Sequence, residues 1–296
     1  MRLGWTMNTV RALRRPLLIV LVLAATLAEA KAAEPPAPAP VPDAAAAQPL
    51  RLPVNAKHVV VVDDATGNVL MARDAAAIVP IASLTKLMTA MVILDARQHP
   101  AERLRISDDD VDRLKHSKSF VRVGTELSRQ DALELALVSS DNRAASALAR
   151  AYPGGESAFV QALQAKVRAL GLRNTSLQEP TGLSPQNTST AIEVARITAA
   201  AARYPEIARI TSSKRATVAL SGRTRELHNT NRLVGAKGWN ILLSKTGYTD
   251  EAGRCLAMRM MSGARAVTVV LLDADGSAHR LRDAALIRKS LSRTAS

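Results

Sequence analysis

Aromatic side chains are scarce in this sequence of 296 residues, where Phe, Trp and Tyr together make up 2%. Proteins that bind single-stranded nucleic acid stack bases on such rings, and here no aromatic residues stand among the dispersed basic ones. The formal net charge of +14 would fit nucleic acid, but the dispersed basic residues without interleaved aromatics make a nucleic-acid partner unexpected. The charge favours loose association with an anionic membrane surface or cell-wall polymer, although an ordinary solvated surface explains it equally well.

Cysteine is nearly absent, because Cys255 is the single one and excludes an internal disulfide. It lies in Arg254-Cys255-Leu256-Ala257-Met258, a pattern typical of a buried strand, so we expect an inert thiol rather than a nucleophile. The five histidines show neither metal-ligand spacing nor pairing. We therefore expect no metal site and no cofactor.

The apolar run at residues 17–27 is shorter than the roughly 18–20 residues that a membrane span needs. Arg11, Arg14 and Arg15 precede it, and Ala28-Glu29-Ala30 is a small-x-small cleavage site, so residues 1–33 are predicted to be a cleaved export signal. An uncleaved N-terminal anchor is the alternative. Residues 34–51, rich in Pro and Ala, predict a disordered linker, and residues 52–296 one folded domain.

Strand patterns stand at both ends of this domain, with helix patterns between them. Two β-branched runs flank a Thr-Gly-Asn turn and predict a hairpin; the further strands and the helices follow from the same periodicity rules. The predicted strands are 58–62, 69–72, 216–220, 241–245, 255–261 and 266–272, with residues 120–124 a short strand or loop. The predicted helices are 106–114, 128–138, 143–152, 156–170, 190–204 (stopped by Pro205) and 279–291, the last with Ala284, Ile287 and Leu291 inward. This order indicates a mixed α/β (α+β) domain, whose sheet joins distant parts of the chain around a helical insert at about 100–210.

A further predicted helix starts near Leu84 and meets no Gly or Pro before Pro100. It is apolar almost all round, which predicts burial. Ser83 and Lys86 are three residues apart on one face, so the amine can reach the hydroxyl. The helix N-terminus disfavours an ammonium and should lower the Lys86 pKa. A lone Ser-x-x-Lys nevertheless arises about once by chance in such a chain, and a serine there is usually an N-cap.

Two further short motifs accompany this pair. Ser140-Asp141-Asn142 lies in a tight break between two predicted helices, where side chains are exposed at a cleft edge. Lys245-Thr246-Gly247 ends a predicted strand, and Gly247 would let a substrate backbone lie against the strand edge. Each motif alone is more often a turn or a strand end. Together, and in this order, they form the set found in serine penicillin-recognising enzymes.

With these motifs the sequence resembles the low-molecular-mass penicillin-binding proteins, the serine D-Ala-D-Ala peptidases, and among them most the D-alanyl-D-alanine endopeptidases. The resemblance covers about residues 55–290, including Tyr152-Pro153-Gly154-Gly155, Glu179-Pro180-Thr181-Gly182-Leu183-Ser184 and Asn229-Thr230-Asn231. It implies a β-lactamase/transpeptidase-like fold, with an antiparallel sheet flanked by helices. The predicted export signal indicates a periplasmic location.

The resemblance also implies roles for the motif residues. Ser83 would be the nucleophile, Lys86 the base, and Ser140 a relay that passes a proton from Lys86 to the leaving amine. Attack would give an acyl-enzyme that water then hydrolyses.

The remaining motif residues would bind the substrate. Asn142 would hold the substrate peptide, and Lys245 and Thr246 its carboxylate, with the Lys245 charge also lowering the Lys86 pKa. The backbone N–H groups of Ser83 and Tyr248 would form the oxyanion hole, next to Gly247.

The implied reaction is hydrolysis of D-Ala–diaminopimelate cross-bridges of peptidoglycan, with β-lactam antibiotics as covalent inhibitors. A D,D-carboxypeptidase is the alternative, although such enzymes commonly add a β-rich domain and a C-terminal anchor, for which about 50 residues after Lys245 leave no room. A β-lactamase is less favoured, because Thr181 and Gly182 replace the Leu-Asn expected after Glu179-Pro180. An inactive wall-binding homologue would show a broken motif, and all three are intact. The oligomeric state stays open.

Overall fold

The computed structural model describes Met1 and residues 51–293. The predicted signal peptide (1–33) and linker (34–51) lie outside the described residues, apart from Met1 and Arg51. Within the described part of the chain, no helix combines the length and the apolar character needed to cross a membrane.

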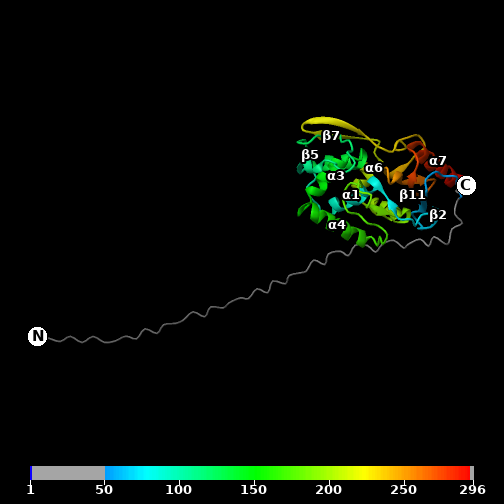
Figure 1. The fold of residues 1–296 in the computed structure, drawn as a ribbon, viewed down its shortest axis with the longest axis horizontal. Coiled ribbons are helices and arrows are strands. Elements are labelled where there is room, and N and C mark those ends of the chain that lie inside the picture. The colour runs from blue at the N-terminus through cyan, green and yellow to red at the C-terminus, as the bar shows by residue number, and fades with distance from the viewer. Residues whose placement is uncertain (2–50, 294–296) are drawn as a thin grey trace. The chain divides into compact units, whose positions relative to one another are not determined.

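One antiparallel sheet of five strands carries the domain, and Figure 1 shows it beside the helices. Its order is β2–β1–β11–β10–β9, so strands from both ends of the domain pair directly, with Val60 opposite Val270. This confirms the predicted hairpin and the predicted sheet from distant segments, and it leaves β9 at an edge. The strands are β1 (His58–Asp63), β2 (Val69–Arg73), β9 (Ile241–Thr249), β10 (Gly253–Ser262) and β11 (Arg265–Ala274).

Both faces of the sheet are buried, because successive side chains of a strand point to opposite faces. In β1, Val59 and Val61 pack toward helix α7 (Ser277–Arg293), whereas Val60 packs toward the other helices. The predicted inner face of α7, formed by Ala284, Ile287 and Leu291, is fully buried as expected. The continuous valine run of β1 is thus explained by two apolar layers.

Cys255 lies on β10 with no exposed surface, and its thiol contacts the Ala252 carbonyl oxygen at 3.3 Å. Burial raises the pKa of this thiol to about 12. The expected inert, buried cysteine is confirmed.

Helix α1 (Thr85–Asp95) is the centre of the helical layer, and every residue from Thr85 to Ile93 is buried. This confirms the burial predicted from its apolar character. Figure 1 shows it among the surrounding helices. These are α2 (Arg129–Val138), α3 (Asn142–Arg150), α4 (Gly155–Ala169), α5 (Ala191–Ala201) and α6 (Pro205–Ser212).

Several sequence predictions need correction. The helix predicted to run to residue 204 ends at Ala201, and Pro205 begins α6 rather than stopping α5, because the first helical position needs no N–H donor. The predicted helix 106–114 contains only the 3₁₀ turn η2 (Asp108–Asp110). Residues 120–124, predicted as a short strand or a loop, form a loop. Strand β8 (Arg223–His228) was missed because nearly all of its side chains are polar and exposed.

The remaining strands form three separate two-stranded ribbons. Strand β8 pairs with β7 (Arg215–Leu220), which Figure 1 shows along the outside of the helices. The other pairs are β3 (Val79–Pro80) with β6 (Thr188–Ser189), and β4 (Arg103–Arg105) with β5 (Glu126–Ser128).

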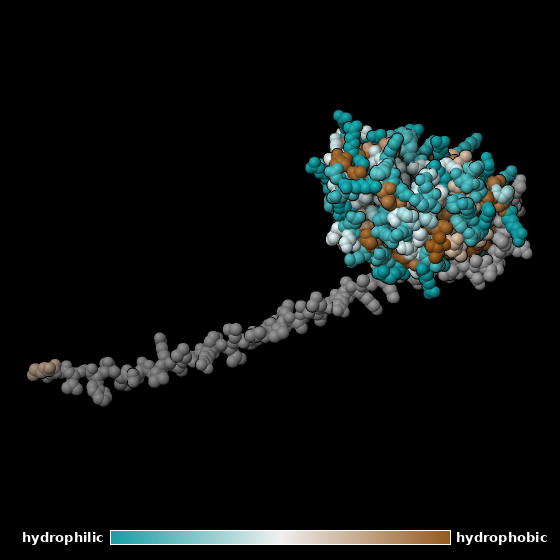
Figure 2. Space-filling model, in the orientation of Figure 1, coloured by the Kyte–Doolittle hydropathy of each residue, from teal (hydrophilic) through white to brown (hydrophobic). Residues whose placement is uncertain are grey.

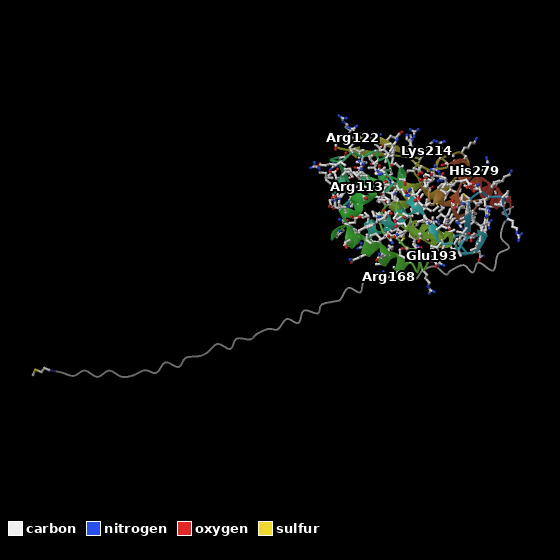
Figure 3. All side chains as sticks on the ribbon, in the orientation of Figure 1. Arg113, Arg122, Arg168, Glu193, Lys214 and His279 are labelled. Carbon is white, nitrogen blue, oxygen red and sulfur yellow. The ribbon has the colours of Figure 1, made fainter. Side chains whose placement is uncertain are left out.

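The surface is largely hydrophilic on the face drawn in Figure 2, with hydrophobic residues scattered over it. Figure 3 shows Arg113, Arg122, Arg168 and Lys214 at separate places, and each is exposed. The basic residues are therefore dispersed in space as they are in the sequence. The absence of a nucleic-acid partner stays a prediction.

The N-terminal end of the described domain is fixed to α7 by Asp283, which is 1% exposed. Its carboxylate accepts hydrogen bonds from the backbone N–H groups of Asn55 (2.9 Å) and Ala56 (2.8 Å). The exposed Asp275 also binds Asn55, through the side-chain amide at 2.7 Å.

We expect Asp283→Ala to lower the free energy of unfolding by about 2 kcal/mol, because it leaves buried N–H groups without an acceptor. In thermal unfolding this corresponds to a fall in Tm of about 4–8 °C. The matched control Asp275→Ala should cost less than about 0.5 kcal/mol, since water replaces its exposed bond. Equal losses in the two variants would contradict this account.

Candidate active site

Ser83 lies in the 3₁₀ turn η1 (Ala82–Leu84), which leads directly into α1. It was predicted in the first turn of an α-helix, but Ala82 has a φ of 46°, outside the right-handed helical region. The Ile81 N–H donates to the Asn187 carbonyl oxygen at 3.0 Å, and the Thr85 hydroxyl to that of Ala82 at 2.9 Å. These bonds fix the turn that presents Ser83.

The Lys86 amine is buried, with the side chain only 1% exposed. Its Nζ lies 2.9 Å from Ser83 Oγ, 2.6 Å from Asn142 Oδ1 and 2.7 Å from the Thr181 carbonyl oxygen. Burial lowers the pKa of Lys86 to about 8, against the raising influence of nearby carboxylates, first of all Glu179. The pKa is lowered as predicted, but the main cause is burial rather than the helix N-terminus.

These three contacts define what a neutral Lys86 amine can do. A neutral amine has two hydrogens and one lone pair, whereas carbonyl oxygens only accept hydrogen bonds. Asn142 Oδ1 and the Thr181 carbonyl can therefore take the two hydrogens. The lone pair is left for the Ser83 hydroxyl, which is the geometry that a general base requires.

The Ser140-Asp141-Asn142 motif forms the predicted break between α2 and α3. Asp141 caps α3 by accepting the Ala144 N–H at 3.0 Å, while Ser140 has a φ of 61°. The Asn142 amide donates to Ser117 Oγ at 2.8 Å, which turns its oxygen toward Lys86. Sequence reasoning missed Ser117, because its position in a loop carries no motif.

Asp141 also holds this loop in place. Its carboxylate accepts hydrogen bonds from the Ser119 hydroxyl at 2.8 Å and the Phe120 N–H at 3.1 Å. The motif's middle residue therefore has a structural task, which is to place the segment that carries Ser117.

Lys245 is 1% exposed and lies on the edge strand β9. Its Nζ is 2.8 Å from Ser140 Oγ and 2.8 Å from the Thr246 carbonyl oxygen. Burial lowers its pKa, and the charges of Lys86 and Arg280 act in the same direction. In the described part of the chain the hydrogen bond of Ser140 runs to Lys245 and not to Lys86. This differs from the direct relay that the resemblance implied.

The Lys245-Thr246-Gly247 motif was predicted to end a strand, but β9 continues to Thr249 because it pairs with β10 up to Gly253. A Cβ at Gly247 would lie 3.0 Å from the Ser83 nitrogen. The missing side chain thus lets the turn of Ser83 itself pack against β9. Thr246 Oγ1 lies 2.6 Å from Thr230 Oγ1.

Tyr248 follows on β9 with 47% of its surface exposed. The Arg254 guanidinium lies 3.5 Å from its ring centroid. The structure therefore brings all the predicted residues into one site: Ser83 and Lys86, Ser140 and Asn142, and the β9 residues Lys245, Thr246, Gly247 and Tyr248.

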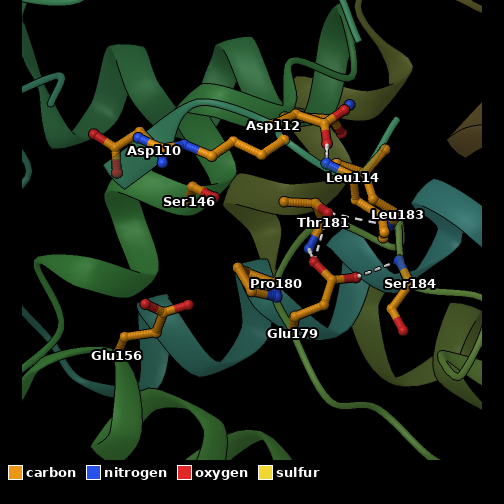
Figure 4. A pocket seen from close by; sticks show the side chains of 12 residues that line it. Asp110, Asp112, Leu114, Ser146, Glu156, Glu179, Pro180, Thr181, Leu183 and Ser184 are labelled. Atoms are coloured by element: carbon orange, nitrogen blue, oxygen red, sulfur yellow. Dashed lines mark hydrogen bonds between the residues drawn. The ribbon is translucent and has the colours of Figure 1, made fainter. Parts of the chain in front are cut away.

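A cavity of about 300 Å³ opens beside this site (Figure 4). Its lining includes Asn142, Glu179, Thr181 and Leu183. Over residues 51–293, no cluster of three or more His, Cys, Asp or Glu side chains could hold a metal ion. The expectation of metal-free chemistry stays a prediction.

A family model described as D-alanyl-D-alanine carboxypeptidase, of the S11 peptidases, matches residues 43–276. The chain belongs to the S11 peptidase family. This agrees with the resemblance that the three motifs indicated.

Two relatives and two solved structures show how similar the chain is to known proteins. The chain is 45% identical over 248 residues to a D-alanyl-D-alanine endopeptidase of Pseudomonas aeruginosa. It is 41% identical over 247 residues to a D-alanyl-D-alanine endopeptidase of Escherichia coli. In both cases the match covers 83% of this chain and 80% of the relative.

The two structures are similar in fold. A mutant of the Streptomyces K15 DD-transpeptidase superposes with a TM-score of 0.76 at 23% identity, covering 82% of this chain and 100% of that one. Penicillin-binding protein D2 of Listeria monocytogenes, in its ampicillin-bound form, gives 0.73 at 25% identity, covering 82% and 99%. The expected β-lactamase/transpeptidase-like fold is confirmed.

Gly182 of the S11 peptidase lies where the loop 179–187 meets the turn of Ser83. Its φ is 82°, and a Cβ there would come within 1.9 Å of the Ala82 carbonyl oxygen. Gly171, at the end of α4, has a φ of 64° but nothing within 4 Å of such a Cβ. Both glycines have a positive φ, but only at Gly182 would a Cβ clash with neighbouring atoms.

We expect Gly182→Ala to cost about 3 kcal/mol or more in the free energy of unfolding, because backbone must move as well as adopt a strained φ. Gly171→Ala should cost only about 1 kcal/mol, from the left-handed backbone alone. Urea unfolding of both variants measures the difference. Similar costs would show that the contact with Ala82 is not restrictive.

Proposed function

We propose that this S11 peptidase is a periplasmic serine D,D-endopeptidase that hydrolyses D-Ala–diaminopimelate cross-bridges of peptidoglycan through an acyl-enzyme. The observation that carries the proposal is the Lys86 amine, 2.9 Å from Ser83 Oγ and oriented by two acceptors. The relatives named D-alanyl-D-alanine endopeptidase support the substrate class. The export pattern of residues 1–33 supports the periplasm.

In the first step, Ser83 Oγ attacks the D-Ala carbonyl carbon while its proton moves to the Lys86 lone pair. The negative charge that develops on the carbonyl oxygen is held by the backbone N–H groups of Ser83 and Tyr248. The close packing of η1 against β9 at Gly247 supports this pairing, because it brings the two backbones together.

The leaving amine then needs a proton. We assign its delivery to Ser140, whose hydroxyl is hydrogen-bonded to Lys245 at 2.8 Å. A lowered pKa makes the Lys245 ammonium a better acid, so it can resupply the proton that Ser140 gives up. The proton that Lys86 took from Ser83 then passes to Lys245, which restores the neutral base and the ammonium before deacylation. The C–N bond breaks, and water later hydrolyses the ester at Ser83.

Lys245 and Thr246 also suit the carboxylate next to the scissile bond. A buried cation and a hydroxyl, the latter 2.6 Å from a second hydroxyl on Thr230, can bind the two carboxylate oxygens. A β-lactam carries a carboxylate in the same relation to its reactive carbonyl. The ampicillin-bound form of penicillin-binding protein D2 supports β-lactam binding here, and we expect the bound β-lactam to acylate Ser83.

A D,D-carboxypeptidase remains the second candidate, because the family model carries that description. The β-lactamase alternative is disfavoured by the surroundings of Glu179. Its carboxylate accepts hydrogen bonds from the N–H groups of Thr181 (2.7 Å) and Gly182 (2.6 Å), both in its own loop. A carboxylate engaged in this way is poorly placed to activate a deacylating water, so we expect a long-lived penicillin adduct.

Fluorescent penicillin should label the wild-type protein covalently, and Ser83→Ala should abolish the labelling. Ser139→Ala is the matched control, because the Ser139 hydroxyl only donates to the Leu135 carbonyl oxygen within α2.

Muropeptides from treated sacculi, separated by HPLC and mass spectrometry, should lose cross-linked dimers. Loss of pentapeptides alone would establish the carboxypeptidase instead, and labelling of Ser83→Ala would remove Ser83 as nucleophile.

The acylation rate should rise with pH, because only the neutral Lys86 amine accepts the Ser83 proton. With a Lys86 pKa of about 8, the neutral fraction and hence the rate increase about fivefold between pH 7 and 8 and level off above pH 9. Stopped-flow acylation by a chromogenic penicillin from pH 6 to 9.5 measures this. A flat profile would rule out Lys86 as the titrating base.

A further inference from the structure

Glu179 is the centre of the hydrogen bonds that shape the loop 179–187. Its Oε2 accepts from the Thr181 N–H at 2.7 Å and the Thr181 hydroxyl at 2.5 Å. Its Oε1 accepts from the Gly182 N–H at 2.6 Å and the Asn187 amide at 3.0 Å. Figure 4 shows the carboxylate turned toward Thr181 and Ser184. One side chain thus fixes both the start and the end of the loop.

The loop shaped by Glu179 contacts the site through its backbone. The Thr181 carbonyl oxygen accepts from Lys86 Nζ at 2.7 Å, and that of Pro180 accepts from the Thr89 hydroxyl at 2.7 Å. Gly182 lies against Ala82, the residue before Ser83. A change in the loop therefore reaches the amine and the nucleophile's turn together.

We propose that Glu179 is a positioning residue for the base: it folds the loop so that the Thr181 carbonyl takes one hydrogen of the Lys86 amine and leaves the lone pair to Ser83. This inference rests on the proposed roles of Ser83 and Lys86. If the Thr181 carbonyl is displaced, the amine can rotate, because Asn142 alone fixes only one of its two hydrogens.

Glu179 acts on Lys86 in a second, separable way, through its charge. Among the nearby carboxylates it is the main influence that raises the Lys86 pKa against burial. Removal of the charge should lower that pKa further. Loss of loop geometry and loss of charge therefore have different signatures, one in the limiting rate and the other in the pH midpoint.

Three variants separate these effects. Glu179→Gln removes the charge and places an amide against N–H donors, whereas Glu179→Asp keeps the charge but is one methylene too short to reach both N–H groups. Glu156→Gln is the control, since this exposed carboxylate borders the same cavity. Across residues 51–293, no hydrogen bond joins Glu156 to the loop 179–187.

The measurement is the pH dependence of acylation by a chromogenic penicillin, with the folded fraction checked by thermal unfolding. We expect Glu179→Gln to lower the limiting rate at least tenfold and to move the midpoint to lower pH. Glu179→Asp should lower the limiting rate similarly and keep the wild-type midpoint. Glu156→Gln should change neither.

Wild-type limiting rates in both Glu179 variants would overturn the proposal. So would rate losses matched by the loss of folded protein with no midpoint shift in Glu179→Gln, since that result indicates a structural role only. If Glu179→Gln does not fold, Thr181→Val tests the same loop by removing one donor to Glu179. This variant should lower the limiting acylation rate a few-fold at an unchanged pH midpoint. An unchanged limiting rate would contradict the proposal.

Failure of this proposal is distinguishable from failure of the proposed function. If penicillin does not acylate the wild-type protein, or acylates it at a rate independent of pH, the roles of Ser83 and Lys86 are contradicted. If the wild-type protein is acylated normally and the Glu179 variants keep its limiting acylation rate, only the role of Glu179 is contradicted. The cross-link preference is decided by the muropeptide products and is independent of both.

Discussion

The structure depends on one buried amine. A lysine taken out of water loses several kcal/mol of solvation unless other groups replace it, and Lys86 finds three oxygens within 2.9 Å. They come from three separate segments: the turn before α1, the first residue of α3, and the loop 179–187. Each segment must be placed by its own contacts before the amine can be satisfied. The site is therefore a product of the whole fold rather than of one motif.

The frame that places these segments is the edge of the sheet together with α1. Strand β9 is held by β10 along its length, and α1 is buried on all sides, so neither moves freely. The turn of Ser83 packs between them because Gly247 has no side chain. The Ser140–Lys245 contact then ties the helical layer to the sheet at the same point.

Much of this arrangement could be predicted from the sequence, because the decisive features were side-chain identities at short spacings. The three motifs, the central sheet strands and the buried α1 all belong to that class. Thr181 could not be found in this way, since it acts through a carbonyl that every residue carries. The pairing of Ser140 with Lys245 was also missed, because it depends on how two distant segments meet. Strand β8 was missed because it lacks apolar alternation, and helix α6 was missed because Pro205 was interpreted only as the stop of the preceding helix.

Cys255 stands directly opposite Gly247 in the ladder between β10 and β9, behind the turn that bears the nucleophile. Its thiol is buried and, with a pKa of about 12, protonated at any physiological pH. Alkylating reagents can therefore reach it only when the apolar core packed on that face of the sheet opens. The thiol thus offers a reporter for the opening of the core beneath the site.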